Sequence, residues 1–121
     1  MNQLGIVLFA HGSRDARWRE PVEAVARQVC VLAPTARVVC AYLELVAPDL
    51  PTAVAALVAG GATAVKVVPL FLGMGKHVRE DLPQLMDTLR ATYPAVSFTL
   101  SRAVGEAPEV IDLLARVALH N

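Results

Sequence analysis

Four short apolar segments alternate along the chain with four longer segments whose apolar residues recur at helical spacing. Short, nearly uncharged runs of this kind predict buried strands, and an alternating pattern in the last run predicts an edge strand. The predicted strands cover residues 4–10, 37–43, 64–70 and 96–100. Strands that alternate with helices predict an α/β fold, with a parallel sheet and helices on both faces.

Right-handed crossovers restrict how such strands can be ordered. The arrangement favoured here is a flavodoxin-like four-stranded parallel sheet of order 2-1-3-4, with residues 1–121 as a single domain. The first helix is predicted over residues 16–32, and the second is expected to open at the turn from Pro48 to Pro51 and to stop at Gly60.

Two further expectations concern the last two helices. Proline is tolerated in the first turn of a helix but not in its interior, so Pro83 predicts a third helix that begins near Glu80 or Asp81. That start would leave His77 in the preceding loop. The last helix is expected to bury its apolar face, formed by Val110, Leu113, Leu114 and Val117.

Composition and charge narrow the class of protein. Hydrophobic residues make up 55% of the chain, which supplies a core and hints at an interface with a second copy. Eleven basic residues balance eleven acidic ones, so neither nucleic acid nor a membrane surface is an expected partner. Cys30 and Cys40 lie among apolar residues and predict two buried, reduced thiols, as in a cytoplasmic protein. No signal peptide or membrane-spanning run is expected.

Three chemically active side chains follow the first three predicted strands. His11, Glu44 and His77 are each 33 residues apart, about one strand–helix–strand unit. Because the carboxyl ends of parallel strands meet at one edge, these residues are expected to share a site. Two imidazoles and a carboxylate can bind a divalent transition metal or accept protons. The alternative is three unrelated surface residues, which is also the expectation for His120 near the end of the chain.

Basic residues and glycines flank these histidines. Arginines suit the recognition of carboxylates or phosphates, although they could equally be a solvated start of a helix. The basic residues are Arg14, Arg17, Arg19, Lys76 and Arg79. Gly73-Met74-Gly75 lacks the signature of a phosphate loop and predicts a flexible lid or a close approach of the backbone. Met74 could lie against a flat apolar ligand or be an ordinary loop residue.

Three segments resemble the CbiX/SirB type of class II tetrapyrrole chelatase. They are Phe9-Ala10-His11-Gly12-Ser13-Arg14-Asp15, Tyr42-Leu43-Glu44-Leu45, and Pro69-Leu70-Phe71-Leu72-Gly73 with His77-Val78-Arg79-Glu80-Asp81-Leu82-Pro83. The resemblance covers essentially the whole chain. It implies a flavodoxin-like lobe that is usually present twice, with a cleft between the lobes. This chain is similar to the short form, which pairs as a homodimer.

The resemblance also implies an activity and the residues that perform it. The activity is insertion of Co²⁺, Fe²⁺ or, in related archaeal forms, Ni²⁺ into sirohydrochlorin, in cobalamin or siroheme biosynthesis. The metal is then a substrate, and no organic cofactor is implied. His11 and His77 would be the metal-handling and catalytic pair, with Glu44 as a third member. The tetrapyrrole would contact Ser13, Arg14, Gly73, Met74, Gly75 and Arg79.

Two functions other than metal insertion share parts of this pattern. A histidine-dependent phosphatase also places His-Gly after its first strand, but it needs an arginine before that histidine, where this chain has Ala10. A non-catalytic carrier of tetrapyrrole or metal would use the same ligands as a chelatase and stays open on sequence grounds.

Overall fold

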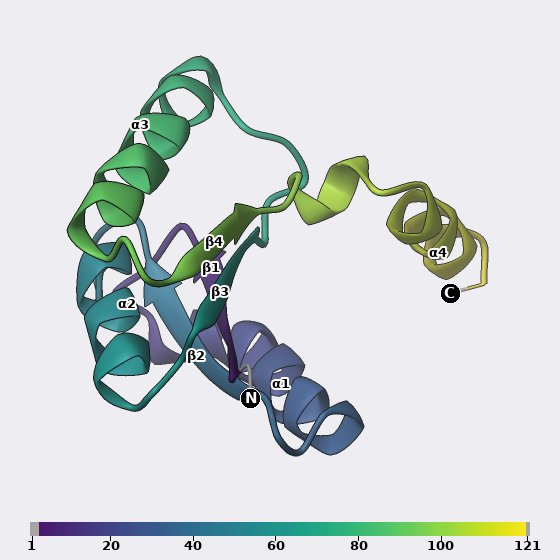
Figure 1. Ribbon diagram of the computed structural model, residues 1–121. Coiled ribbons are helices and arrows are strands. Elements are labelled where there is room, and N and C mark those ends of the chain that lie inside the picture. The colour runs from purple at the N-terminus through teal and green to yellow at the C-terminus, as the bar shows by residue number, and fades with distance from the viewer. Residues whose placement is uncertain (1–2, 121) are drawn as a thin grey trace.

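A four-stranded parallel sheet in the order β2-β1-β3-β4 forms the centre of the computed structural model, which describes residues 3–120 (Figure 1). The strands are β1 (Leu4–Ala10), β2 (Arg37–Tyr42), β3 (Ala64–Pro69) and β4 (Ser97–Leu100). Each strand lies within one residue of the segment that the apolar pattern predicts, and the predicted order is confirmed. The central strands, β1 and β3, each pair with a neighbour on both sides, whereas β2 and β4 form the edges of the sheet.

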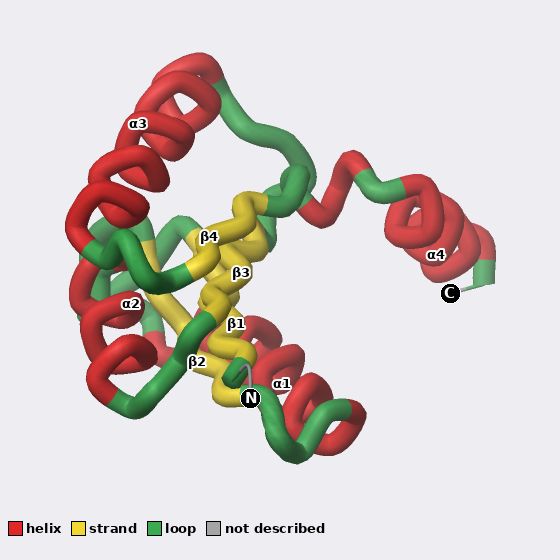
Figure 2. Tube along the Cα trace, in the orientation of Figure 1, coloured by secondary structure: helices red, strands yellow, loops and turns green. Residues whose placement is uncertain are grey.

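The main core lies between one face of the sheet and the helices α2 (Leu50–Ala59) and α3 (Lys76–Thr92), which Figure 2 shows on the same side of the sheet. Alternate residues of β1 and β3 point to this face, among them Val7, Val65 and Val67. They meet buried side chains of the two helices, including Leu57 and Met86. Burial of these side chains is the main force that fixes both helices against the sheet.

The helix α1 (Ala16–Leu32) covers the opposite face, but only part of it. A small second core joins its residue Val22 to Ala10 and Tyr42, at the carboxyl ends of β1 and β2. The bounds of α1 agree with the prediction. Asp15 caps its first turn by accepting a hydrogen bond from the backbone N–H of Arg17 at 2.9 Å.

The prediction for the start of α3 was wrong. The helix begins at Lys76, with Gly75 as its N-cap, so His77 lies in the first turn rather than in the loop. Pro83 lies inside the helix, where its ring nitrogen cannot donate to the carbonyl of Arg79. Burial of Leu82 and Met86 on either side of this break holds the helix together in spite of the lost hydrogen bond.

The prediction for the last helix was also wrong. After a short 3₁₀ turn (Val104–Glu106), α4 (Pro108–Leu119) stands apart from the sheet (Figure 1) and buries none of its residues. Leu113, Leu114 and Val117 are exposed to 60%, 46% and 58%. The helix is amphipathic, as the sequence indicates, but within residues 3–120 most of its apolar face is left exposed.

Both cysteines are free, but only one fits the expectation of a buried thiol. Cys30, near the end of α1, is exposed. Cys40 is half-buried, and this burial raises the pKa of its thiol above the ordinary value. Across residues 3–120, every helix is too short or too polar to cross a lipid bilayer.

We expect Pro83→Ala to stabilise the protein. Alanine restores a backbone N–H for the carbonyl of Arg79 and removes the steric conflict of proline in a helix interior. The gain should be about 2 kcal/mol in the free energy of unfolding, after allowance for the more flexible unfolded chain. Urea unfolding followed by circular dichroism measures this quantity.

Pro51→Ala is the matched control, because Pro51 lies in the first turn of α2, where its missing N–H has no partner to lose. This variant should be neutral or destabilised by up to about 1 kcal/mol. Equal effects of the two substitutions would contradict our account of Pro83.

Candidate functional site at the carboxyl edge of the sheet

The loops that follow β1 and β2 are joined by backbone hydrogen bonds that continue the sheet beyond its strands. Leu43 N–H donates to the Ala10 carbonyl at 2.9 Å, and Glu44 N–H donates to the His11 carbonyl at 3.0 Å. Residues 11 and 44 are therefore neighbours along the edge, as their positions after adjacent parallel strands predict. The left-handed backbone of Leu45, with φ of 69°, turns the chain away directly after Glu44.

Gly12 allows this close approach of the two loops. Its φ is +106°, in the left-handed region that other residues rarely adopt. A Cβ atom at this position would overlap the backbone carbonyl of Glu44. Only glycine satisfies both conditions, so the contact between the two loops depends on this residue.

The imidazole of His11 lies against the ring of Phe71, with 4.3 Å between the ring centroids. Phe71 in turn contacts Phe9, with 5.9 Å between their centroids. Both phenylalanines are buried, whereas His11 is exposed. The two fixed rings thus place an accessible imidazole at the surface of the core, where it can meet a ligand.

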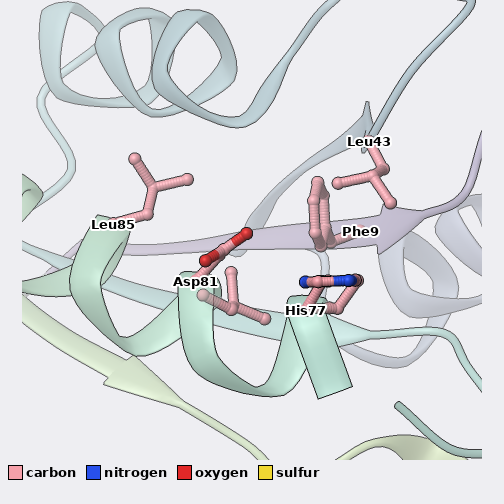
Figure 3. A pocket seen from close by; sticks show the side chains of 7 residues that line it. Phe9, Leu43, His77, Asp81 and Leu85 are labelled. Carbon is pink, nitrogen blue, oxygen red and sulfur yellow. The ribbon is translucent and has the colours of Figure 1, made fainter. Parts of the chain in front are cut away.

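A cavity of about 300 Å³ lies between α3 and the ends of β1 and β2. Its walls are mostly apolar, and its polar lining comes from His77 and Asp81, one helical turn apart. The lining residues are Phe9, Leu43, His77, Val78, Asp81, Leu82 and Leu85. Figure 3 shows His77 and Asp81 projecting from α3 toward the space beside Phe9 and Leu43. A largely apolar pocket with a few polar groups is typical of a site for a small organic ligand.

The three predicted metal-handling residues share this edge but do not form a closed metal cage. Within residues 3–120, no three His, Cys, Asp or Glu side chains lie close enough together to hold an ion. His77 lines the cavity, whereas His11 is not among its lining residues and contacts Phe71, whose ring lies against the lining residue Phe9. Glu44 is tied to His11 through the backbone, and its carboxylate is exposed.

The residues predicted to contact an organic substrate differ in how freely they could do so. The hydroxyl of Ser13 accepts a hydrogen bond from the Asp15 N–H at 3.1 Å, so it already has a structural role at the start of α1. Arg14 and Arg79 are exposed, and neither forms an ion pair with any residue between 3 and 120. Both guanidinium groups are therefore available to an anionic ligand.

The segment Gly73-Met74-Gly75 contains both open backbone and a fixed side chain. A Cβ atom at Gly73 or Gly75 would meet nothing within 4 Å, so neither glycine is required by packing in this chain. Met74 packs against the main core and is half-buried. The segment lies open at the surface, and Met74 fastens it to the body of the protein.

Comparison with known families decides which class of protein this is. The CbiX family model matches residues 5–120. The chain belongs to the CbiX family. Its curated relatives include the sirohydrochlorin cobaltochelatase of Sulfolobus acidocaldarius, 28% identical over 92% of this chain and 86% of that protein. The sirohydrochlorin ferrochelatase of Bacillus subtilis is 29% identical over 88% of this chain but only 41% of its own length.

Solved structures give the same result. A CbiX protein from Marinobacter aquaeolei VT8, named for cobalamin biosynthesis, aligns with a TM-score of 0.78 at 36% identity, over 96% of this chain and 93% of that one. The chelatase SirB from Bacillus subtilis subspecies spizizenii, solved in complex with cobalt, aligns with a TM-score of 0.80 at 25% identity. That alignment covers 97% of this CbiX chain and 50% of SirB, so this chain spans half of the SirB polypeptide.

Sequence reasoning missed several residues that shape the site. Asp81 lies one helical turn after His77 on α3. This spacing can be recognised from the sequence only if the helix begins before His77, and the position of Pro83 led us to predict a later start. Phe9 lies in the first predicted strand and Phe71 directly follows the third, and neither was given a role in the site. Their aromatic side chains next to the histidine loops were the available signal for their role beside His11.

Gly12→Ala should disrupt this site and lower the stability of the CbiX fold. Alanine would be strained at the positive φ and would push the Glu44 carbonyl away from the first loop. We expect a loss of more than about 1 kcal/mol in the free energy of unfolding, measured by urea denaturation.

Gly73→Ala is the matched control, since it adds the same methyl group to open space in another loop of the same edge. It should change the free energy of unfolding by less than about 0.5 kcal/mol. If Gly12→Ala were equally harmless, the contact between the two loops would not depend on glycine.

Proposed function

We propose that this CbiX chain is a sirohydrochlorin chelatase, a lyase that inserts Co²⁺ or Fe²⁺ into the tetrapyrrole during cobalamin or siroheme biosynthesis. The observation that supports the proposal is an apolar cavity lined by His77 and Phe9, in a chain that the CbiX model matches over residues 5–120. His11 lies nearby, against Phe71, whose ring contacts Phe9. The relatives named as cobaltochelatases and ferrochelatases support the same assignment.

The reaction exchanges two protons for one metal ion. The pyrrole nitrogens of the substrate lose two N–H protons as the divalent ion enters the ring. The active site therefore needs both a base for the protons and a ligand for the metal. Neutral imidazoles at His11 and His77 can hold the ion briefly or accept a proton. The carboxylate of Glu44 would offset the charge of the ion and orient an imidazole. Because the metal is a substrate that must leave, loose binding is an advantage.

We propose that two copies pair to complete the site. The cavity of about 300 Å³ is at the lower end of the range for ligand pockets, and one side of it is open to solvent. A planar tetrapyrrole placed on this edge would extend beyond it. SirB is about twice as long as the part that this chain matches, and a homodimer would provide a second lobe of the same kind. We place this dimer in the cytoplasm, where free thiols such as Cys30 persist.

The principal alternative is a carrier that binds tetrapyrrole or metal without turnover. Incubation with sirohydrochlorin and excess Co²⁺, followed through the absorption spectrum, separates the two functions. A chelatase converts many equivalents of tetrapyrrole per protein, whereas a carrier stops at one. Parallel reactions with Fe²⁺ and Ni²⁺ identify the preferred metal.

His11→Ala and His77→Ala should each lower the rate of insertion by at least 100-fold, because each removes a proton acceptor or metal ligand. Neither histidine is part of the core, so the thermal midpoint should stay within a few degrees of the parent.

His120→Ala is the control for this experiment, because His120 follows α4, outside the candidate site. Its rate should equal that of the parent. A His77→Ala protein that folds normally and inserts metal at the parental rate would disprove the assignment of the site.

Arg14→Gln and Arg79→Gln should weaken binding of the tetrapyrrole and leave the affinity for metal unchanged. Sirohydrochlorin carries many carboxylates, and loss of one charge-assisted hydrogen bond corresponds to about 1.5 kcal/mol, or about tenfold in the dissociation constant. Fluorescence quenching by the tetrapyrrole measures this constant. Arg27→Gln, an exposed position in the middle of α1, is the control and should bind like the parent.

A further inference from the structure

The carboxylate of Asp81 has no structural task in the fold. Each of the other aspartates accepts a hydrogen bond, either from the first turn of a helix that it caps or from an arginine on the same helix. They are Asp15, Asp49, Asp87 and Asp112. Asp81, by contrast, takes part in no hydrogen bond or ion pair with any residue between 3 and 120. Its carboxylate is therefore available to a partner that the chain itself does not supply.

Asp81 lies on the wall of the cavity, one helical turn from His77. Side chains four residues apart on a helix share one face, with about 5–6 Å between their Cβ atoms. Figure 3 shows both side chains projecting from α3 toward the same space. The wall around them is apolar and includes Phe9, Leu43 and Leu85. An imidazole and a carboxylate are thus the polar side chains of an otherwise apolar cavity.

Without Asp81, the surroundings of His77 are unfavourable for a cation. His77 lies in the first turn of α3, and the start of a helix carries the positive end of the helix dipole. Lys76 and Arg79 add positive side chains beside it. Glu80 and Asp81 carry the opposite charge, but of these two only Asp81 lines the cavity. A divalent ion at His77 therefore depends on Asp81 for charge compensation on the cavity side.

The charge of Asp81 also limits which part of a bound tetrapyrrole it can face. The carboxylates around the rim of sirohydrochlorin would be repelled by another carboxylate, and the guanidinium groups of Arg14 and Arg79 suit them instead. The centre of the ring is different, because a divalent ion enters there while two N–H protons leave. A carboxylate in the cavity attracts that ion, so Asp81 suits the metal rather than the rim of the ring.

We infer that Asp81 is a metal-handling residue, and that its carboxylate and the His77 imidazole together receive the divalent ion before it enters the ring. Residues at this spacing present two ligands from one helix face to a single ion, as in helical zinc sites. Within residues 3–120 no third His, Cys, Asp or Glu completes a cage, so the pair holds the ion loosely, as suits a substrate that has to leave. Each histidine then has its own carboxylate, Asp81 for His77 and Glu44 for His11. The identity of this ion as the one inserted rests on the proposed function.

Titration with Co²⁺ in the absence of tetrapyrrole tests the pair directly. Asp81→Asn keeps the size of the side chain and removes its charge, and should raise the dissociation constant for Co²⁺ about tenfold or more, measured by the visible absorption of the bound ion. Glu80→Gln makes the same change of charge on the next residue, outside the cavity, and should stay within about threefold of the parent. Both positions are exposed, so both variants should keep the parental circular dichroism spectrum and thermal midpoint.

A double-mutant cycle shows whether both side chains hold the same ion. With His77→Ala already in place, Asp81→Asn should change the affinity for Co²⁺ by less than about threefold, because the pair acts as a unit. Two fully additive losses would mean that the side chains act separately and would overturn the inference. It is also overturned if Asp81→Asn binds Co²⁺ as tightly as Glu80→Gln does.

Turnover separates metal handling from binding of the tetrapyrrole. In the insertion assay, Asp81→Asn should raise the KM for Co²⁺ about tenfold and leave the KM for sirohydrochlorin unchanged, whereas Arg79→Gln should do the reverse. A raised KM for sirohydrochlorin with an unchanged KM for Co²⁺ would contradict the inference. If the parent inserts no metal, the proposed function fails, but the titration with Co²⁺ still decides the role of Asp81.

Discussion

The structure depends on the central position of β1, which is hydrogen-bonded on both sides along its whole length. The hydrogen bonds do not stop where the strands end. Glu44 donates to His11 on one side, and Leu70 N–H donates to the Phe9 carbonyl at 2.7 Å on the other. The first turns of three loops are therefore fixed in register with the sheet. A site on these loops is therefore held in place by the core and is less mobile than a site on an ordinary surface loop.

The same arrangement explains which parts of the site are rigid and which are open. The loop at His11 has little conformational freedom. Its imidazole packs against Phe71, which packs against Phe9, and Gly12 lies against the backbone of Glu44. At Gly73 and Gly75 the space that a Cβ atom would occupy is open, although Met74 between them packs against the core. A rigid loop around His11 beside an open segment at residues 73–75 suits a large flat substrate. The rigid loop can position a metal while the open segment admits the ring.

The sequence was sufficient for those features that depend on local pattern and general topology. Apolar runs located all four strands, and right-handed crossovers gave their order. The start of α3 could not be predicted from Pro83, because the burial of Leu82 and Met86 outweighs the cost of proline in that helix. The amphipathic pattern of α4 was recognised, but a pattern does not say what it packs against. Periodicity predicts that one face of the helix is apolar, whereas the connection at Ala103 and Gly105 decides where the helix lies relative to its own sheet.

Length and geometry together explain why a half-length chain can perform the function of a longer one. In a chain that contains two lobes, the second lobe is covalently linked to the first. The linker therefore fixes the local concentration of one lobe near the other. A single-lobe CbiX chain carries one such lobe, and its cavity of about 300 Å³ is near the lower end of the range for ligand pockets. Under the proposed pairing, a second copy supplies the other lobe, so the local concentration of that lobe depends on association rather than on a covalent connection.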